Sequence, residues 1–422
     1  MKKIALICLY ILITAGYLTA QPNTSTYTLF KPNRVFDGRD IHIGWWVLVY
    51  GNKIEAAGPS EQIKVPARAE VKVLAGMTLM PGMIEGHSHL FLHPYNETSW
   101  NDQVLNESRA ERTARAVTHA RETLLHGFTT TRELGTEGAG YDDVGLKAAI
   151  DKGVIFGPRI LTATRAIVAT GSYGPKSAVA ETVLPQGAEE ADGTDGLTRA
   201  IRSQIGHGAD VIKLYADYHW GVNNQSAPTF TLDELKLAVQ VAGSSGRTVA
   251  VHSSTAEGMR RATLAGVTTI EHGDEGTPET FKLMKEHNVA LCPTIAADEA
   301  IMMYRGWKKG TDPEPERIKQ KHLSFTQALK AGVTICFGGD VGVFPHGDNA
   351  RELLLMVEYG MKPVDALRSA TAVNAEVFRL PQLGQIKAGY LADLVAVEGN
   401  PIEDIKAVKE VKMVMKDGVT VK

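Results

Sequence analysis

The chain has 422 residues, of which 44% are hydrophobic and 22% are charged, and its formal net charge is -3. This length is too great for a single small domain and accommodates a barrel of roughly 250 residues with an accessory domain. The sequence contains no block of lysine and arginine, so its charge excludes a nucleic-acid partner and favours a small-molecule ligand.

Residues 1–20 have the organisation of an export signal. Lys2 and Lys3 form a basic start, an apolar run covers 4–18, and Thr19-Ala20 offers small residues for cleavage. A retained anchor is the less favoured alternative, because the apolar run is shorter than the roughly 20 residues that span a bilayer. We therefore expect a signal peptide at 1–20, a periplasmic or extracellular protein, and no membrane association after the signal is removed.

Short β-rich segments at both ends of the chain predict a second, smaller domain. Near the N-terminus, the apolar runs 45–50 and 53–58 flank Gly51-Asn52, which is typical of a hairpin turn. Near the C-terminus, strands are expected at 391–397 and within 408–421. Neither end has enough strands to bury a core alone. We expect 21–80 and 380–422 to combine into one small β-sandwich.

Between these ends, apolar strand patterns alternate with helical patterns such as the one that follows the Thr231-x-x-Glu234 capping box. Eight strands are expected, at 78–89, 128–134, 159–165, 211–217, 248–254, 269–273, 289–294 and 333–340. Eight apolar strands, each followed by a helix, predict an α/β fold with a (β/α)8 TIM barrel over 81–379. The segment 171–196 has no clear periodicity, and we expect it to be a functional loop.

Polar residues occur at the C-terminal ends of the predicted strands, where barrels of this kind place their active sites. Each has a structural alternative: a histidine is often a hydrogen-bonded core residue, and an aspartate often caps a helix. The first strand ends in a His-x-His pair, and this spacing puts both imidazoles on one face. Six residues from five strands together predict a metal site: His87, His89, Lys213, His252, His272 and Asp340.

In this order, the six residues resemble the ligands of the binuclear-metal amidohydrolase superfamily, and the resemblance covers the whole mature chain. The segment 337–353, which begins Phe337-Gly338-Gly339-Asp340, resembles the imidazolonepropionase-like branch. Within that branch, the run 213–218 (Lys-Leu-Tyr-Ala-Asp-Tyr) is similar to that of secreted Xaa-Pro dipeptidase and carboxypeptidase-like enzymes. This group also includes ochratoxin-hydrolysing amidases.

The resemblance implies two divalent metal ions. His87, His89 and Asp340 would hold the more buried ion, His252 and His272 would hold the other, and Lys213 would bridge them as a carbamate formed with CO2. Zinc is the expected metal because imidazole and carboxylate suit it, and manganese, cobalt and iron remain alternatives. The implied reaction is amide hydrolysis by a metal-bridging hydroxide, with Asp340 as the catalytic acid and base.

Four further residues are candidates for contact with substrate. Tyr215 lies two residues after Lys213 and on the same face, so its hydroxyl is placed to bind the oxyanion or a substrate carboxylate, unless it only packs in the barrel. Arg132 and His219 are weaker candidates for a substrate carboxylate, and a structural ion pair is the alternative for Arg132. His346 directly follows the eighth predicted strand.

These residues favour an enzyme that cleaves the amide (C–N) bond of dipeptides or N-acyl amino acids. The enzymatic alternative is a hydrolase of cyclic amides, lactones or aryl-linked amino-acid amides such as ochratoxin. From a different class, a non-catalytic metal- or solute-binding barrel is the second alternative, although such a protein has no need of Asp340. The expected partner is a small molecule or dipeptide, and a homo-oligomer remains open.

Overall fold

The computed structural model describes residues 26–177, 179 and 181–422. The predicted signal peptide, residues 1–20, lies outside this range and stays a prediction. Among the described residues, no helix combines the length and apolar character needed to cross a membrane.

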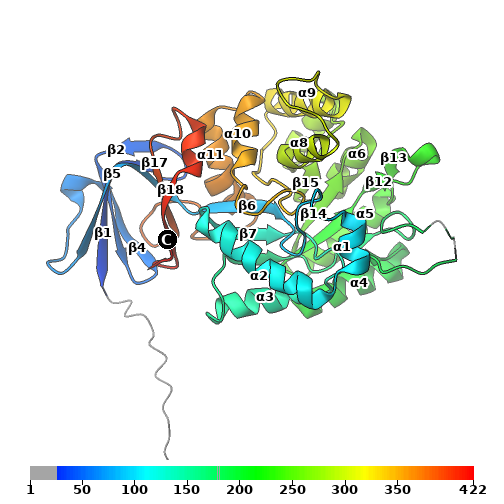
Figure 1. Cartoon of the computed structure of the whole chain (residues 1–422), viewed down its shortest axis with the longest axis horizontal. Helices are drawn as coiled ribbons and strands as arrows, with labels where there is room; N and C mark the ends of the chain where they lie inside the picture. Colours follow the sequence, from blue (N-terminus) through cyan, green and yellow to red (C-terminus); the bar gives the residue numbers. More distant parts are fainter. Residues whose placement is uncertain (1–25, 178, 180) are drawn as a thin grey trace, which may run out of the picture.

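Both ends of the chain meet in one eight-stranded sheet, with β1, β4 and β5 at the left of Figure 1 and β17 and β18 nearer the helices. Its order is β19-β18-β17-β5-β1-β3-β4, with β2 paired to β1. Strand β5 joins the two ends, because it pairs parallel with β1 and antiparallel with β17. The predicted β-domain from both chain ends is therefore confirmed. Its strands are β1 (Tyr27–Phe36), β2 (Ile41–Ile43), β3 (Trp45–Tyr50), β4 (Lys53–Pro59), β5 (Glu70–Pro81), β17 (Leu394–Glu398), β18 (Val411–Lys416) and β19 (Val419–Thr420).

The first predicted barrel strand, 78–89, is in fact divided between the two domains. Strand β5 ends at Pro81 in the terminal sheet, and β6 (Met83–Ser88) begins the barrel. Gly82 separates them and leaves no room for a side chain, since a Cβ there would lie 2.1 Å from Thr129 Oγ1. The close approach to β7 thus fixes the point at which the chain passes from one domain to the other.

The barrel strands form two sheets, β6-β7-β8 and β10-β9-β11-β14-β15-β16. Parallel bridges Leu291↔Ile335 and Ser88↔Val341 connect them on one side, and the Asp210 N–H donates to Thr162 O at 2.7 Å on the other. The strands thus follow one another around a (β/α)8 barrel, which confirms the predicted fold class. Their bounds are β7 (Phe128–Glu133), β8 (Arg159–Thr162), β9 (Ile167–Val168), β10 (Glu189–Glu190), β11 (Val211–Tyr215), β14 (Thr248–Ser253), β15 (Thr269–His272) and β16 (Ala290–Cys292).

The eighth predicted strand, 333–340, forms only single bridges in place of a ladder. Cys336 N donates to Leu291 O of β16 at 2.8 Å. The next residue bonds to a side chain: Asn374 Oδ1 accepts from Phe337 N at 3.2 Å, and Asn374 Nδ2 donates to Phe337 O at 2.8 Å. The chain then turns at Asp340, where φ is +61°. Single backbone bonds to β6 and β16, together with the buried Asn374 side chain, therefore hold this segment where a full ladder is missing.

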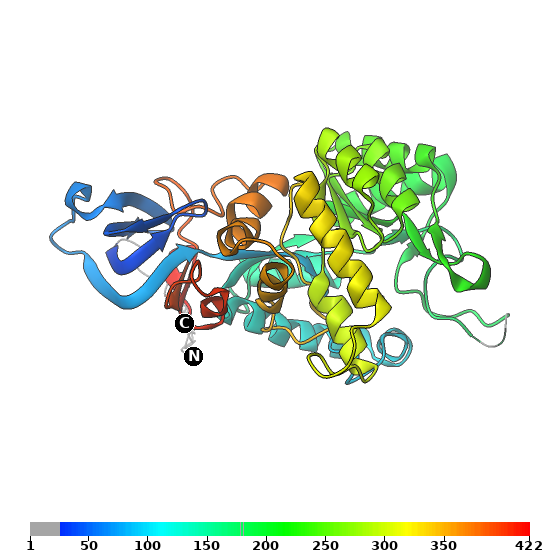
Figure 2. The ribbon, with the colours of Figure 1, turned by 90° about the horizontal axis from the view of Figure 1, so that it is seen from above.

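Helices surround the strands, with α2, α3 and α4 along one side and α8, α9 and α10 along the other in Figure 1; Figure 2 shows α9 crossing the length of the barrel. The predicted capping box of α5 is present, formed by Thr231 and Glu234. The predicted loop 171–196 contains β10 and the start of α4. The helices are α1 (Trp100–Asn106), α2 (Arg109–Leu125), α3 (Asp142–Asp151), α4 (Gly193–His207), α5 (Leu232–Gly243), α6 (Ala256–Ala265), α7 (Pro278–Glu286), α8 (Ile295–Tyr304), α9 (Glu316–Ala331), α10 (Arg351–Glu358), α11 (Pro363–Arg368) and α12 (Asn374–Val377). A short hairpin, β12 (Asp217–His219) and β13 (Ser226–Pro228), follows β11.

Candidate active site

The six predicted metal ligands come together at the C-terminal ends of the barrel strands. Five of them line one pocket of about 780 Å³, and Lys213 is fully buried in the adjoining strand β11. The barrel fold explains this convergence, because its parallel strands all present their carboxyl ends at one face. The five lining residues are His87, His89, His252, His272 and Asp340.

The donor atoms are spaced as a cation would require. Ligand atoms of His87, His272 and Asp340 all lie within 4.8 Å of one another. Asp340 Oδ1 is 3.5 Å from His87 Nε2 and 3.3 Å from His89 Nε2. Imidazole nitrogens and a carboxylate oxygen around one point are the ligands of divalent transition metals, so these residues fit a metal ion.

Hydrogen bonds to the other ring nitrogens orient these imidazoles. His87 Nδ1 lies 3.0 Å from Glu271 Oε2, His89 Nδ1 lies 2.8 Å from Gly135 O, and His272 Nδ1 lies 2.8 Å from Thr294 Oγ1. A bond at Nδ1 fixes the ring and directs Nε2 to the metal, which is the usual arrangement around metal-binding histidines. Two side chains and one main-chain carbonyl therefore set the orientation of these three imidazoles.

Burial keeps several of these imidazoles neutral. Burial, reinforced by the charge of Lys213, lowers the pKa of His87 to about 4 and that of His252 to about 3. Burial acts in the same direction on His89, but its hydrogen bond with Asp340 outweighs burial and raises its pKa to about 9. A neutral imidazole is the form that binds a metal, so His87 and His252 are ready for that role. A metal ion beside Asp340 would compete with the proton for Nε2 of His89.

Lys213 is the least satisfied polar group of the site. Its side chain is fully buried, and Nζ has no hydrogen-bond partner among the described residues. An unpaired ammonium in this position would cost several kcal/mol. The orphaned nitrogen therefore indicates a bound group that is not part of the polypeptide.

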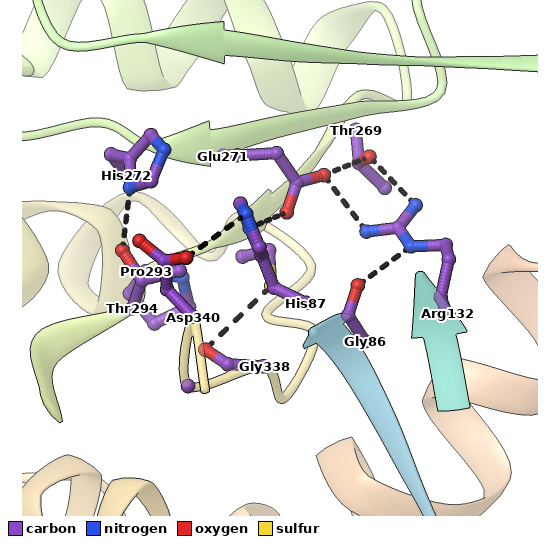
Figure 3. A network of polar contacts seen from close by, with 12 residues as sticks. Gly86, His87, Arg132, Thr269, Glu271, His272, Pro293, Thr294, Gly338 and Asp340 are labelled. Atoms are coloured by element: carbon purple, nitrogen blue, oxygen red, sulfur yellow. Dashed lines mark hydrogen bonds and ion pairs between the residues drawn. The ribbon is translucent and has the colours of Figure 1, made fainter. Parts of the chain in front are cut away.

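The structure contradicts the predicted substrate contact of Arg132. Its guanidinium is 2% exposed and lines no part of the pocket. It donates to Gly86 O at 2.6 Å and to Glu271 Oε1 at 2.8 Å, as Figure 3 shows. Strand β7 directs this side chain into the barrel interior, so the alternative of a structural ion pair is the correct one. Through Glu271, Arg132 supports His87.

The other substrate candidates divide in the same way. Tyr215 and His219 line the pocket, and their contact with substrate stays a prediction. His346 does not line the pocket. It is half-buried beside His119, with ring centroids 4.3 Å apart, and its Nε2 lies 3.2 Å from Leu92 O. The chain turns away from the pocket between Asp340 and His346, so its position after the eighth segment does not bring it to the site.

Several residues of the site were not predicted from the sequence. Glu271 immediately precedes His272, and a carboxylate within an apolar strand is the signal that identifies it. Glu137, Tyr173 and Tyr218 also line the pocket. Glu137 had a weaker signal, since it is an acidic residue in the glycine-rich loop that directly follows a barrel strand. The two tyrosines carry no sequence signal of their own.

A barrel that closes on a cluster of histidines and an aspartate defines a metal-dependent hydrolase of the amidohydrolase class. Residues 78–421 match the Amidohydrolase family, and the chain belongs to this family. It is 34% identical over 364 residues to "Ochratoxinase" of Aspergillus niger, which covers 80% of this chain and 73% of that protein.

Solved structures give the same assignment. A Xaa-Pro dipeptidase with bound methionine superposes with a TM-score of 0.83 at 32% identity, covering 94% of this chain and all of the other. The A. niger ochratoxinase structure gives a TM-score of 0.80 at 27% identity, over 94% of this chain and 96% of that one. The protein is therefore a hydrolytic enzyme that acts on amide bonds, which sets aside the non-catalytic barrel.

Proposed function

We propose that this enzyme hydrolyses the amide bond of dipeptides or N-acyl amino acids with the help of two divalent metal ions. The observation that supports this most directly is the set of four histidines and Asp340 around the orphaned Nζ of Lys213. One ion would be held by His87, His89 and Asp340 and the other by His252 and His272. Zinc suits these ligands best.

Lys213 would lie between the two ions as a carbamate. Reaction of its amine with CO2 forms an N–C bond, releases one proton, and converts a buried nitrogen without a partner into an anion with two oxygen atoms. An anion there offsets the charge of the cations beside it. The proposal thus accounts for a fully buried lysine whose Nζ has no partner among the described residues.

When bound, the ions would supply Lewis acidity toward the substrate carbonyl and lower the pKa of a water. Asp340 would accept the proton of that water and deliver it to the leaving nitrogen, because its carboxylate faces the centre of the site. The pKa of Asp340 is held below its usual range: burial raises it, but the neighbouring imidazoles outweigh burial. The Tyr215 hydroxyl would stabilise the developing oxyanion.

An aryl-linked amino-acid amide is the second candidate substrate. The similarity to the A. niger ochratoxinase over 80% of this chain favours it. Both candidate classes present an amide next to an amino acid, so the same metal ligands would serve either.

The test is amine release by the purified chain after loading with zinc and bicarbonate. The panel contains Xaa-Pro and other dipeptides, N-acyl amino acids, an aryl-linked phenylalanine amide and a lactone, with Asp340→Asn as the matched inactive control. Cleavage of amides that carry a free carboxylate supports the proposal. A preparation that opens only the lactone, or releases amine equally well with Asp340→Asn, refutes it.

A further inference from the structure

One pocket residue is held in place without a role in the metal site. Glu137, in the loop after β7, lines the pocket although it is only 1% exposed. Its Oε2 accepts hydrogen bonds from Tyr173 at 2.6 Å and from Trp100 Nε1 at 3.0 Å. Its Oε1 has only a long contact with the Tyr215 hydroxyl, at 3.5 Å, among the described residues. One oxygen is thus anchored, and the other remains available to a ligand.

The Glu137 carboxylate also lacks a cationic partner. Within 26–177, 179 and 181–422, its side chain takes part in no ion pair. The nearby guanidinium of Arg112 donates to the main-chain carbonyls of Phe91, Thr136 and Glu137, at 3.1, 3.0 and 2.7 Å. Arg112 thus makes three hydrogen bonds to the main chain and none to the Glu137 carboxylate. A buried carboxylate without a direct counter-ion is costly, so a cationic ligand would stabilise this position.

Three tyrosines form a wall beside Glu137. The ring centroids of Tyr173 lie 4.7 Å from Tyr215 and 4.8 Å from Tyr218, and all three rings line the pocket. Burial, together with the charge of Glu137, raises the pKa of Tyr218 to about 12, so its ring stays neutral. Aromatic faces attract ammonium groups. A carboxylate beside three aromatic rings is suited to a protonated amine and repels a carboxylate or phosphate.

This group lies directly against the metal ligands. The loop that carries Glu137 accepts the hydrogen bond of His89 through Gly135 O, at 2.8 Å. On the other side, the Tyr215 ring stacks on His252 with centroids 4.6 Å apart. In a dipeptide, the α-amino nitrogen is two bonds, or about 2.5 Å, from the carbon of the scissile carbonyl. A substrate carbonyl at the metal site therefore brings a free amino terminus close to this group.

The opposite wall of the pocket carries two arginines beside the acids Asp298 and Glu316. Arg305 and Arg317 both line it, at the end of α8 and the start of α9. These helices follow β16, the seventh barrel strand, and Tyr173 follows the third, so the two walls face each other across the barrel. Arg317 keeps a partner in Asp298, 2.5 Å away. A zwitterionic substrate would thus place its amine toward Glu137 and its carboxylate toward the arginines.

We propose that Glu137, together with Tyr173, Tyr215 and Tyr218, binds the free amino terminus of the substrate and makes the enzyme selective for unblocked dipeptides. This inference rests on the proposed amide hydrolysis and narrows its substrate class. The enzyme would hydrolyse dipeptides in preference to N-acyl amino acids and aryl-linked amides, since neither of these carries an ammonium group next to the scissile carbonyl.

Two substrates that differ only in the amine test the proposal by turnover. They are alanyl-X and propionyl-X, where X is the C-terminal residue preferred in the amide panel. The parent is expected to favour alanyl-X in kcat/KM, and Glu137→Gln is expected to reduce that preference roughly 10- to 100-fold. Glutamine retains an oxygen for Tyr173 and Trp100, so the loop is preserved. Glu316→Gln, which removes an exposed acid of the same pocket, should keep the parental ratio.

A preference that survives in Glu137→Gln, or equal cleavage of both substrates by the parent, would overturn the proposal while leaving amide hydrolysis intact. Binding of leucinol and of 4-methylpentan-1-ol, measured by calorimetry on the metal-loaded protein, tests it without turnover. Leucinol is expected to bind more tightly than the alcohol, and to lose that advantage in Glu137→Gln. If no amide is cleaved but leucinol binds in this way, the amine site stands and the proposed reaction fails. Equal binding of the two compounds refutes the amine site.

Discussion

Glu271→Gln tests whether the buried ion pair behind the metal site organises it. The Glu271 carboxylate is fully buried and accepts from Arg132 at 2.8 Å and from Thr269 at 2.5 Å, while its second oxygen lies 3.0 Å from His87 Nδ1. The substitution leaves Arg132 as a buried cation without its counter-ion. Removing one partner of a buried pair costs about 3–5 kcal/mol, and loss of the bond to a metal-binding histidine lowers metal affinity about 10- to 100-fold.

Urea unfolding of the metal-free protein measures the first effect, and zinc titration measures the second. Glu275→Gln, which removes an exposed acid from the same pocket, is the control and should change the free energy of unfolding by no more than about 0.5 kcal/mol. Burial raises the pKa of Glu271, but Arg132 and His87 outweigh burial and hold it below the usual range. Its contribution to stability is therefore complete above pH of about 4.3 and is lost as pH falls through the lower folded value. A loss below about 1 kcal/mol at pH 7, with unchanged zinc affinity, would refute a supporting role for this pair.

Other substitutions separate the remaining roles. Asp340→Asn is expected to lower kcat on the best amide substrate by about 10²- to 10⁴-fold, and unchanged turnover would remove its assigned proton transfer. Lys213→Met should lower the metal content of the purified protein, measured by mass spectrometry, and abolish any dependence of activity on bicarbonate; a full metal complement argues against a bridging carbamate. Tyr215→Phe should lower kcat about 10²- to 10³-fold if its hydroxyl meets the oxyanion, whereas a KM effect confined to substrates with a free carboxylate would assign it to carboxylate binding. Gly82→Ala should destabilise the protein by at least about 1–3 kcal/mol in urea unfolding, because its Cβ would lie 2.1 Å from Thr129 Oγ1; a neutral effect would show that this crossing tolerates a side chain.

The fold and the metal ligands follow from the sequence because both depend on short-range regularities. Strand periodicity and the rule that barrels carry chemistry at strand ends bring His87, His252 and His272 together without any knowledge of the loops. Arg132 shows the limit of that rule. It also lies near the end of a strand, but it points into the barrel interior and meets Glu271 from β15. The direction of a side chain depends on the register between neighbouring strands. The sequence of one strand alone does not determine that register.

The amine-binding wall shows a second limit. Glu137 and Tyr173 lie in different loops after barrel strands and Tyr215 is the last residue of β11, so their contacts arise only when the barrel closes. Each residue taken alone has an ordinary explanation, as a packing tyrosine or a solvated acid. The hydrogen bond from Tyr173 to Glu137 makes them a unit, since it fixes a carboxylate that would otherwise turn toward solvent. The sequence gives the residues of this group but does not show that they come into contact in the fold.

The backbone is strained at two of the predicted metal ligands, and buried polar side chains bond to the backbone beside them. His272 and Asp340 have φ values of +75° and +61°, a region that residues other than glycine rarely adopt. Lys321 Nζ, 1% exposed, donates to the carbonyls of His272 and Pro293 at 3.0 and 2.6 Å, and it also contacts Asp274.

Glu85 acts in the same way on the other side of the site. Its carboxylate accepts from the amides of His87 and Gly339, both at 3.0 Å, and thereby ties the first strand to the segment that carries Asp340. A cation on one side and a carboxylate on the other thus stabilise backbone turns that would cost about 1–3 kcal/mol each. These turns point the imidazole of His272 and the carboxylate of Asp340 toward one site, so we expect metal binding to depend on Lys321 and Glu85, which hold the turns.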